Sequence, residues 1–499
     1  MGKTLTVAFQ TLEKNQYLYD VNTGTVISDN GILGGAMRLL DSGASEDEAE
    51  EALCKEYPSH LVHGVFRFIR RWRANYSGFG NSSTENKITE PKKELIQDEY
   101  DNGMTYLMVL NVTENCNFRC KYCYLTEEYD FTRNRTSNRM SFETAKKAMD
   151  QYFDYLRKLR KKIPNKKAGI TIYGGEPLLE IDLVRKIVAY CRENEPVPII
   201  LNMTSNGYLL TDEIMDFVVE NEIHLAVSLD GSMKNHDRNR VLTGEQGSHE
   251  RVVKNLMRFQ EKYPDYGNIG IISVYDTKTD LVENERFFME NKLPRIFFIN
   301  EVSATNTNYY DRFTKDDVRN FHEVHDKLMR KYIKAKQNNE EMSDYLQMLF
   351  EAPISLTVMR LRHLDAKSAL LPYTNTCIPG MKLSIRTDGK IDICERINST
   401  FPIGDIENGL NLDAISGIIK QYNESVTKEC AECDSKNNCP LCFAYTNGNG
   451  DFHIREGFCE NWRKLQREKF AVVYSILEKN PTAFDNLHNN LSSSFLFRV

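Results

Sequence analysis

Hydrophobic and polar positions alternate with two different periods in the N-terminal part of the chain. Alternation with period two predicts three short strands, over residues 4–10, 16–20 and 25–28. Apolar residues at helical spacing then predict three helices, over residues 32–40, 49–57 and 61–72. Ser45 stands at the N-cap position of the second helix, and Glu48 at the position that completes a capping box. We therefore expect residues 1–80 to form a small α+β domain.

A polar stretch over residues 81–103, with few large apolar residues, predicts a linker to a second domain. Strand-like runs then alternate with helical patterns. The predicted strands are residues 106–112, 170–173, 199–203, 225–229, 269–274 and 296–299, and the helices between them include residues 141–159, 211–219 and 248–263. Six strands alternating with helices imply parallel pairing through right-handed crossovers, hence an α/β barrel or an open sheet.

The last part of the chain has a different pattern. Residues 317–350 are helical and heavily charged, and after Leu371 short strands, turns and cysteines follow. The region from about residue 370 to 465 has few apolar residues for a core. We expect bound metal to contribute to its folding free energy.

Length and charge narrow the possible partners. A chain of 499 residues predicts two to four domains. With 64 basic and 71 acidic residues the net charge is -7, which disfavours nucleic acid or an anionic membrane as an obligate partner. No run approaches the roughly 18 apolar residues of a membrane span, and the N-terminus lacks the apolar core of a secretory signal. We expect a cytoplasmic protein.

The twelve cysteines indicate metal binding, because cytoplasmic thiols are kept reduced and rarely form disulfides. Cys54 and Cys191 lie on helical, apolar stretches and are expected to be buried structural thiols. The other ten form two groups: Cys116, Cys120 and Cys123, and then Cys377, Cys394, Cys430, Cys433, Cys439, Cys442 and Cys459.

The first group spans eight residues at the end of a predicted strand, which suits an iron-sulfur cluster with one iron left open. Zinc would recruit a fourth Cys or His nearby, and none follows before His224. The Cys-x3-Cys-x2-Cys spacing, with Tyr122 before the third cysteine, resembles the radical S-adenosylmethionine (SAM) superfamily. The resemblance implies a partial (β/α)6 barrel over residues 104–350 and a SAM-binding 4Fe-4S cluster on Cys116, Cys120 and Cys123, the catalytic centre.

Further matches follow at the strand ends, where α/β folds build ligand sites. Glycines allow close approach of the main chain to a ligand, and the superfamily presents backbone groups to the SAM amino group from a motif like Gly174-Gly175-Glu176-Pro177. The resemblance also implies SAM contacts from Tyr122, Ser205, Asn206, and Ser228 or Asp230. Arg240 and Arg251 are both candidates for a carboxylate partner, and the sequence leaves both open.

In this superfamily one electron breaks the SAM sulfonium and gives a 5'-deoxyadenosyl radical, which abstracts hydrogen from an unactivated carbon. The resemblance therefore implies an external electron donor of the flavodoxin or ferredoxin type.

The second cysteine group would fit a zinc knuckle if it stood alone. Behind a radical SAM loop it resembles the SPASM extension, which carries two auxiliary 4Fe-4S clusters; we assign it to residues 351–475, followed by a tail over residues 476–499. The family's interleaved ligation implies an outer cluster on Cys430, Cys433, Cys439 and Cys459, and an inner cluster on Cys377, Cys394 and Cys442. The x2 spacing between Cys439 and Cys442 departs from the usual x3.

The inner set is one thiolate short of four. Either a ligand other than Cys completes it and the cluster is an electron relay, or one iron stays open to a substrate thiolate. The open iron would place substrate sulfur beside the radical, as is thought to occur in thioether-forming maturases of the sactipeptide and ranthipeptide type.

The N-terminal domain resembles the winged-helix-like peptide-recognition element of ribosomal-peptide maturation systems, which binds a precursor leader as an extra strand. A dimerisation or packing domain is the alternative. As a whole, the resemblance implies an enzyme that installs a Cys-derived thioether crosslink in a ribosomally made precursor peptide. Carbon-carbon crosslinking, sulfatase-type formylglycine formation and, outside enzymology, a zinc-stabilised binding module remain alternatives.

Overall fold

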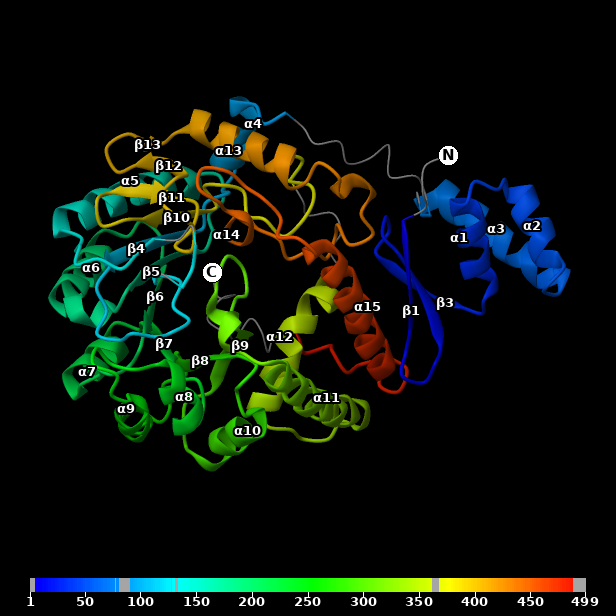
Figure 1. Cartoon of the computed structure of the whole chain (residues 1–499). Helices are drawn as coiled ribbons and strands as arrows, with labels where there is room; N and C mark the ends of the chain where they lie inside the picture. Colours follow the sequence, from blue (N-terminus) through cyan, green and yellow to red (C-terminus); the bar gives the residue numbers. More distant parts are fainter. Residues whose placement is uncertain are drawn as a thin grey trace.

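A computed structural model describes residues 5–76, 78–79, 90–126, 128–130, 133–360 and 368–487 (Figure 1). The first residue of the predicted strand over 4–10, residues 81–89 of the predicted linker and residues 488–499 of the predicted tail lie outside this description. Within the described residues, no helix is long and apolar enough to cross a membrane.

The N-terminal domain is a three-stranded antiparallel sheet with three helices on one face. The strands pair in the order β1 (Thr6–Gln10), β2 (Gln16–Asp20) and β3 (Thr25–Asp29), and the helices are α1 (Ile32–Asp41), α2 (Glu46–Cys54) and α3 (Ser59–Tyr76). These six elements confirm the predicted strands and helices. The predicted capping box is also present, because Ser45 Oγ accepts from the Glu48 N–H and the Glu48 carboxylate accepts from the Ser45 N–H.

The other face of this sheet packs on a helix from the far end of the chain, α15 (Phe458–Leu477) (Figure 1). The ring of Tyr19 lies 4.7 Å from that of Phe470. Just beyond the helix, the Glu478 carboxylate accepts from the Tyr17 hydroxyl at 3.0 Å. The N-terminal domain is therefore fixed to the C-terminal region by aromatic packing and hydrogen bonds.

A ten-stranded sheet forms the centre of the molecule, in the order β13-β12-β11-β10-β4-β5-β6-β7-β8-β9. Its six consecutive parallel strands are β4 (Leu107–Thr113), β5 (Ala168–Gly174), β6 (Ile199–Ser205), β7 (His224–Ser228), β8 (Ile269–Tyr275) and β9 (Ile296–Glu301). The helices that alternate with them are α5 (Phe142–Arg160), α6 (Ile181–Asn194), α7 (Asp212–Glu220), α8 (Met233–Asn239), α9 (His249–Lys262) and α10 (Leu281–Glu290). All six predicted strands are confirmed, and α5, α7 and α9 are the predicted helices.

One short helix, α4 (Lys93–Asp101), differs from the prediction of a linker over residues 81–103. Most of its side chains are polar, but Ile96 is fully buried in the central core. One apolar residue is too weak a signal to predict a helix from sequence, because burial against a distant segment stabilises it.

The C-terminal region joins the same sheet. Two helices, α11 (Lys315–Asn338) and α12 (Asp344–Arg360), precede the strands β10 (Lys382–Ile385), β11 (Lys390–Asp392), β12 (Pro402–Asp405) and β13 (Gly409–Leu410), and then α13 (Leu412–Ser425), α14 (Phe443–Thr446) and α15. Strand β10 pairs in parallel with β4, and Asn111 Nδ2 donates to Ser384 Oγ at 3.1 Å. The cysteine-rich region is therefore continuous with the barrel sheet (Figure 1).

Candidate functional site

The first cysteine group lies on the loop that leaves the carboxyl end of β4. Cys116 Sγ accepts the N–H of Phe118 at 3.4 Å. The thiols lie close enough that Cys123 and Cys116 both raise the pKa of Cys120, which burial and these neighbours bring to about 12. Burial likewise raises the pKa of Cys116 to about 11. The structure thus brings the three predicted ligands together in a partly buried position.

Gly174 and Gly175 end β5 directly against the start of this loop. A Cβ on Gly174, whose φ is 141°, would lie 2.2 Å from the Thr113 carbonyl oxygen, and a Cβ on Gly175 would lie 2.1 Å from that of Asn115. The Gly175 N–H donates to Thr113 O at 2.8 Å, and the Glu176 N–H to Asn115 O at 2.9 Å. The glycines therefore allow β5 and the cysteine loop to run in contact, a role that the sequence alone did not assign.

Glu176 joins the ends of β5 and β6. Its side chain is 1% exposed and accepts three hydrogen bonds, from the Asn206 N–H at 2.7 Å, Ser205 Oγ at 2.8 Å and the Leu178 N–H at 3.0 Å. The last of these caps the short 3-10 helix Pro177–Glu180. Burial raises the pKa of Glu176, and the three donors oppose that effect. Its carboxylate oxygens are occupied by donors from the chain itself.

Asn206 connects this brace to the cysteine loop. Its Nδ2 donates to Asn117 Oδ1 at 2.8 Å, and its Oδ1 accepts the Tyr208 N–H at 3.0 Å. The predicted residues Glu176, Ser205 and Asn206 therefore form one hydrogen-bonded unit with the loop.

A buried guanidinium lies on the other side of the loop. Arg240 is 8% exposed and donates through Nη1 to the Tyr122 hydroxyl at 2.8 Å, which in turn donates to Asp230 Oδ2 at 2.5 Å. Burial lowers the pKa of Arg240, but Cys120, Tyr122 and Asp230 together raise it well above its ordinary value. Within the part of the chain that the structure describes, Arg240 Nε is buried without a hydrogen-bond partner.

The structure distinguishes this arginine from the second candidate. The guanidinium carbon of Arg251 lies 4.2 Å from the ring centroid of Tyr208, and that ring packs edge-on against Phe118. Arg251 is therefore one aromatic ring further from the thiols than Arg240. Ser228 ends β7 opposite Ile272 and is partly exposed.

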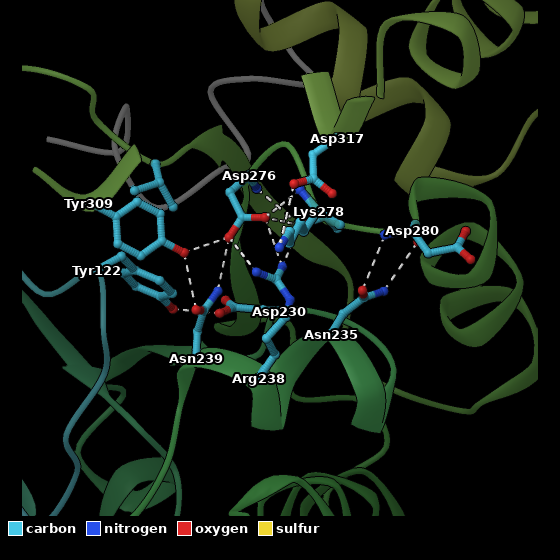
Figure 2. Close-up of polar contacts among 12 residues, drawn as sticks. Tyr122, Asp230, Asn235, Arg238, Asn239, Asp276, Lys278, Asp280, Tyr309 and Asp317 are labelled. Carbon is cyan, nitrogen blue, oxygen red and sulfur yellow. Dashed lines mark hydrogen bonds and ion pairs between the residues drawn. The ribbon is translucent and has the colours of Figure 1, made fainter. Parts of the chain in front are cut away.

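A polar network that the sequence reasoning missed follows β8 (Figure 2). Both guanidinium nitrogens of Arg238 donate to the Asp276 carboxylate at 2.8 Å, and the Tyr309 hydroxyl donates to it at 2.5 Å. Burial acts to raise the pKa of Asp276, but Arg238 and Tyr309 more than offset it, so that the pKa is lowered. The ring of Tyr309 lies edge-on to that of Tyr122 at 6.4 Å. An acidic residue just after a predicted strand was the signal that could have revealed this network.

The C-terminal cysteines occupy two places. At the first, the pKa of Cys394 responds to Cys442 and that of Cys442 to Cys377. At the second, burial and then Cys433 raise the pKa of Cys459. Cys430 belongs to the second place, because the Cys433 N–H donates to its carbonyl at 3.1 Å.

These contacts coincide with the two implied ligand sets for six of the seven cysteines. The seventh, Cys439, is buried and lies near Tyr422, as Cys442 does.

A shared backbone feature tests whether these thiols fit iron-sulfur clusters. In five cases the N–H two residues later donates to the cysteine sulfur: Cys116 from Phe118, Cys123 from Leu125, Cys394 from Arg396, Cys433 from Ser435 and Cys442 from Ala444. Such bonds stabilise the thiolate, which is the form that binds metal. Among the described residues no three His, Cys, Asp or Glu side chains are placed to share one metal ion. The ligands of a 4Fe-4S cluster each bind a different iron, and the donor sets fit clusters.

The cysteine loop and the first C-terminal set border the same side chains. Burial raises the pKa of Tyr129 to about 12, with Arg396 opposing this rise and Cys123 adding to it. The pKa of Tyr173 is raised by burial and then by Glu395, and Cys123 adds to the effect. Side chains around Cys394 are thus within electrostatic reach of residues that also sense Cys123.

A parallel α/β sheet with a three-thiol loop after its first barrel strand, and polar residues at the following strand ends, defines a class of enzymes that bind a cofactor at the carboxyl edge of the sheet. Residues 110–287 match the Radical SAM superfamily. The chain therefore carries a radical SAM domain, and it is an enzyme.

Three relatives illustrate how far this similarity extends. The chain is 36% identical over 130 residues to the uncharacterized protein MJ0907 of Methanocaldococcus jannaschii, a match that covers 26% of this chain and less than half, 40%, of that protein. It is 22% identical over 388 residues to the radical SAM cyclopropyl synthase TigE of Paramaledivibacter caminithermalis, covering 74% of this chain and 76% of TigE. It is 21% identical over 386 residues to the cysteine-type anaerobic sulfatase-maturating enzyme of Clostridium novyi, covering 74% of this chain and 96% of that enzyme.

Solved structures show the same fold. Native anSMEcpe with bound AdoMet superposes with a TM-score of 0.55 at 16% identity, covering 76% of this chain and 99% of that one. The expected radical SAM α/β fold is therefore confirmed, and about a quarter of this chain has no counterpart in that structure.

Proposed function

We propose that this enzyme is a peptide maturase that installs a Cys-derived thioether crosslink in a ribosomally made precursor peptide. The observation that carries the proposal is the shared border between the two thiol groups, since Tyr173 senses both Cys123 and Glu395, the residue after Cys394. A substrate residue held at this border would be within reach of a SAM-derived radical and of a sulfur bound at the inner set.

The residues around the cysteine loop fit SAM and its cluster. When bound, these groups supply a 5'-deoxyadenosyl radical by one-electron cleavage of the sulfonium. Cys116, Cys120 and Cys123 would hold three irons. Arg240 would offer its charge and its unpartnered Nε to the SAM carboxylate, because a guanidinium fork matches a carboxylate. Tyr122 orients that guanidinium through its hydroxyl.

The inner set, Cys377, Cys394 and Cys442, would hold an auxiliary cluster with one iron open to the thiolate of a substrate cysteine. The outer set, Cys430, Cys433, Cys439 and Cys459, would hold a cluster with four thiolates and relay electrons from an external flavodoxin or ferredoxin. An open iron suits crosslinking because it fixes the sulfur where the carbon radical forms. A relay role for both clusters is the competing assignment.

The N-terminal sheet is suited to bind the precursor leader as a fourth strand. Strand β3 pairs with β2 only, among the described residues, so its outer edge can accept an extended peptide. The β1 side of the sheet is held by the C-terminal helix, because Ser475 Oγ accepts the Leu12 N–H at 2.8 Å. We therefore assign the leader to the β3 edge. In support, solved anSMEcpe holds the Cp18Cys peptide, so a protein of this fold can take a peptide substrate.

The decisive experiment uses anaerobically reconstituted full-length enzyme, SAM, a reductant and the Cys-bearing peptide encoded beside its gene. Mass spectrometry should find the loss of two hydrogens per crosslink, together with a thiol that iodoacetamide no longer alkylates. An alkylatable thiol with a new carbon-carbon bond would contradict the thioether.

Two variants locate the chemistry. Cys116→Ala should abolish 5'-deoxyadenosine formation, because the SAM-binding cluster loses a ligand. Cys377→Ala should leave SAM cleavage intact and remove only the crosslink. If Cys377→Ala makes the crosslink at the wild-type rate, the inner set does not hold the substrate sulfur.

Formylglycine formation is the second candidate, favoured by the match to 96% of the Clostridium novyi sulfatase-maturating enzyme. A sulfatase-derived peptide with a Cys in place of the precursor peptide tests it, and conversion of that Cys to an aldehyde would identify it. Metal analysis tests the non-enzymatic alternative, because a zinc-stabilised module would contain zinc and no acid-labile sulfide.

A further inference from the structure

Arg396 carries a positive charge that no carboxylate neutralises in the described part of the chain. It stands two residues after Cys394, and its side chain is half-buried. None of the ion pairs among the described residues includes it, and its guanidinium carbon lies 5.3 Å from the ring centroid of Tyr445. Burial lowers its pKa, but Tyr445, Cys442 and Cys394 raise it above the ordinary range of arginine. The cation is therefore permanent and is directed at the inner thiols.

The neighbouring charges leave this cation in surplus. Lys382, the other basic residue that acts on Cys394, pairs with Glu395 at 3.2 Å. Asp392 pairs with Arg386, and Arg133 lies 4.0 Å from the same carboxylate. The acids of this neighbourhood are thus already matched by bases other than Arg396.

The backbone of Arg396 acts in the same direction as its side chain. Its N–H donates to the Cys394 sulfur, and its guanidinium lowers the pKa of Cys442 against the effect of burial. Both contacts favour extra negative charge on the sulfur atoms. Reduction of a cluster adds one negative charge, and a nearby cation in a partly desolvated position stabilises the reduced form.

We propose that Arg396 sets the reduction potential of the inner auxiliary cluster, as a positioning residue whose uncompensated charge lies against the ligands Cys394 and Cys442. This inference rests on the proposed function only in that the inner cysteines hold a cluster. One electron passes from the external flavodoxin or ferredoxin to the cluster. No bond breaks and no proton moves, because Arg396 is charged in both redox states.

The test is a potentiometric titration, monitored by electron paramagnetic resonance, of full-length enzyme with the SAM-binding cysteines replaced in the triple variant Cys116→Ala, Cys120→Ala, Cys123→Ala. Only the C-terminal clusters then contribute signals, and Cys394→Ala identifies the inner one. Arg396→Gln removes the charge and keeps much of the side-chain volume. We expect it to shift the inner midpoint potential to more negative values and to leave the outer one in place, and Arg396→Lys to restore most of the shift.

Arg463→Gln is the matched control. Arg463 also lies beside thiols, Cys433 and Cys459, but it pairs with Asp434 at 3.4 Å. Its replacement should leave the inner potential unchanged.

An unshifted inner potential in Arg396→Gln, with iron content equal to that of the parent, would overturn the assignment. Equal loss of iron in Arg396→Gln and Arg396→Lys would overturn it as well, because the effect would not follow the charge. The proposed function fails differently: the parent itself would then carry no iron on its C-terminal cysteines.

Discussion

Replacing Glu176 should uncouple the ends of β5 and β6 from the cysteine loop. In Glu176→Ala the Asn206 N–H, the Leu178 N–H and Ser205 Oγ lose their common acceptor in a site from which water is excluded. An unsatisfied buried donor costs about 1–3 kcal/mol. Allowing for partial relaxation of three donors, we expect a loss of about 3–5 kcal/mol in local stability.

Glu176→Gln is the graded control for this estimate. Its single carbonyl oxygen can serve Ser205 and Leu178, which share Oε1, while its amide group then meets the Asn206 N–H donor to donor. The loss of one acceptor predicts about 1–3 kcal/mol. The order of stability should therefore be wild type, then Gln, then Ala.

Hydrogen exchange of the full-length apoprotein measures this directly, in peptides that contain the amides of Leu178 and Asn206. Faster exchange should be confined to these strand ends and to the cysteine loop, because Asn206 donates to Asn117. SAM cleavage by the reconstituted variant should fall with it. Wild-type protection of both amides in Glu176→Ala would refute the reasoning, since the carboxylate would then not be their required acceptor.

Two further predictions follow from backbone contact and from charge. Gly175→Ala should destabilise the fold by more than about 2 kcal/mol, because its Cβ would lie 2.1 Å from the Asn115 carbonyl, whereas Gly64→Ala, with open space on α3, should stabilise by about 0.5–1 kcal/mol; urea denaturation compares them. Asp276→Asn should cost about 3–5 kcal/mol at pH 7, because it leaves Arg238 without its buried partner. The pKa of Asp276 is lowered in the folded state, so its contribution is present above the unfolded pKa of about 3.9 and is lost as pH falls below it; the stability gap between variant and wild type should therefore narrow in acid, and a gap independent of pH would contradict the ion pair.

The sequence determined the parts of this protein that depend on local pattern. The spacing of Cys116, Cys120 and Cys123 is a contiguous motif, and it indicated the chemistry before any fold was known. The six barrel strands were predictable because each is a continuous apolar run, and the capping box at Ser45 because both partners lie three residues apart.

Tertiary structure decided what depends on residues far apart in the chain. Two arginines were equal candidates in sequence, and only burial beside Cys120 distinguishes Arg240 from Arg251. The docking of Tyr19 on Phe470 brings together residues about 450 positions apart, which no local period can encode.

The cysteine-rich region shows the same division most clearly. Its composition indicated metal, yet its continuity with the barrel depends on β10 pairing with β4, across roughly 270 residues. That pairing brings Cys394 toward the side chains around Cys123 and leaves Arg396 facing the inner thiols. Sequence lists the thiols and charged groups, but the distances and compensating charges that set their chemistry arise only when long-range burial fixes the strands against one another.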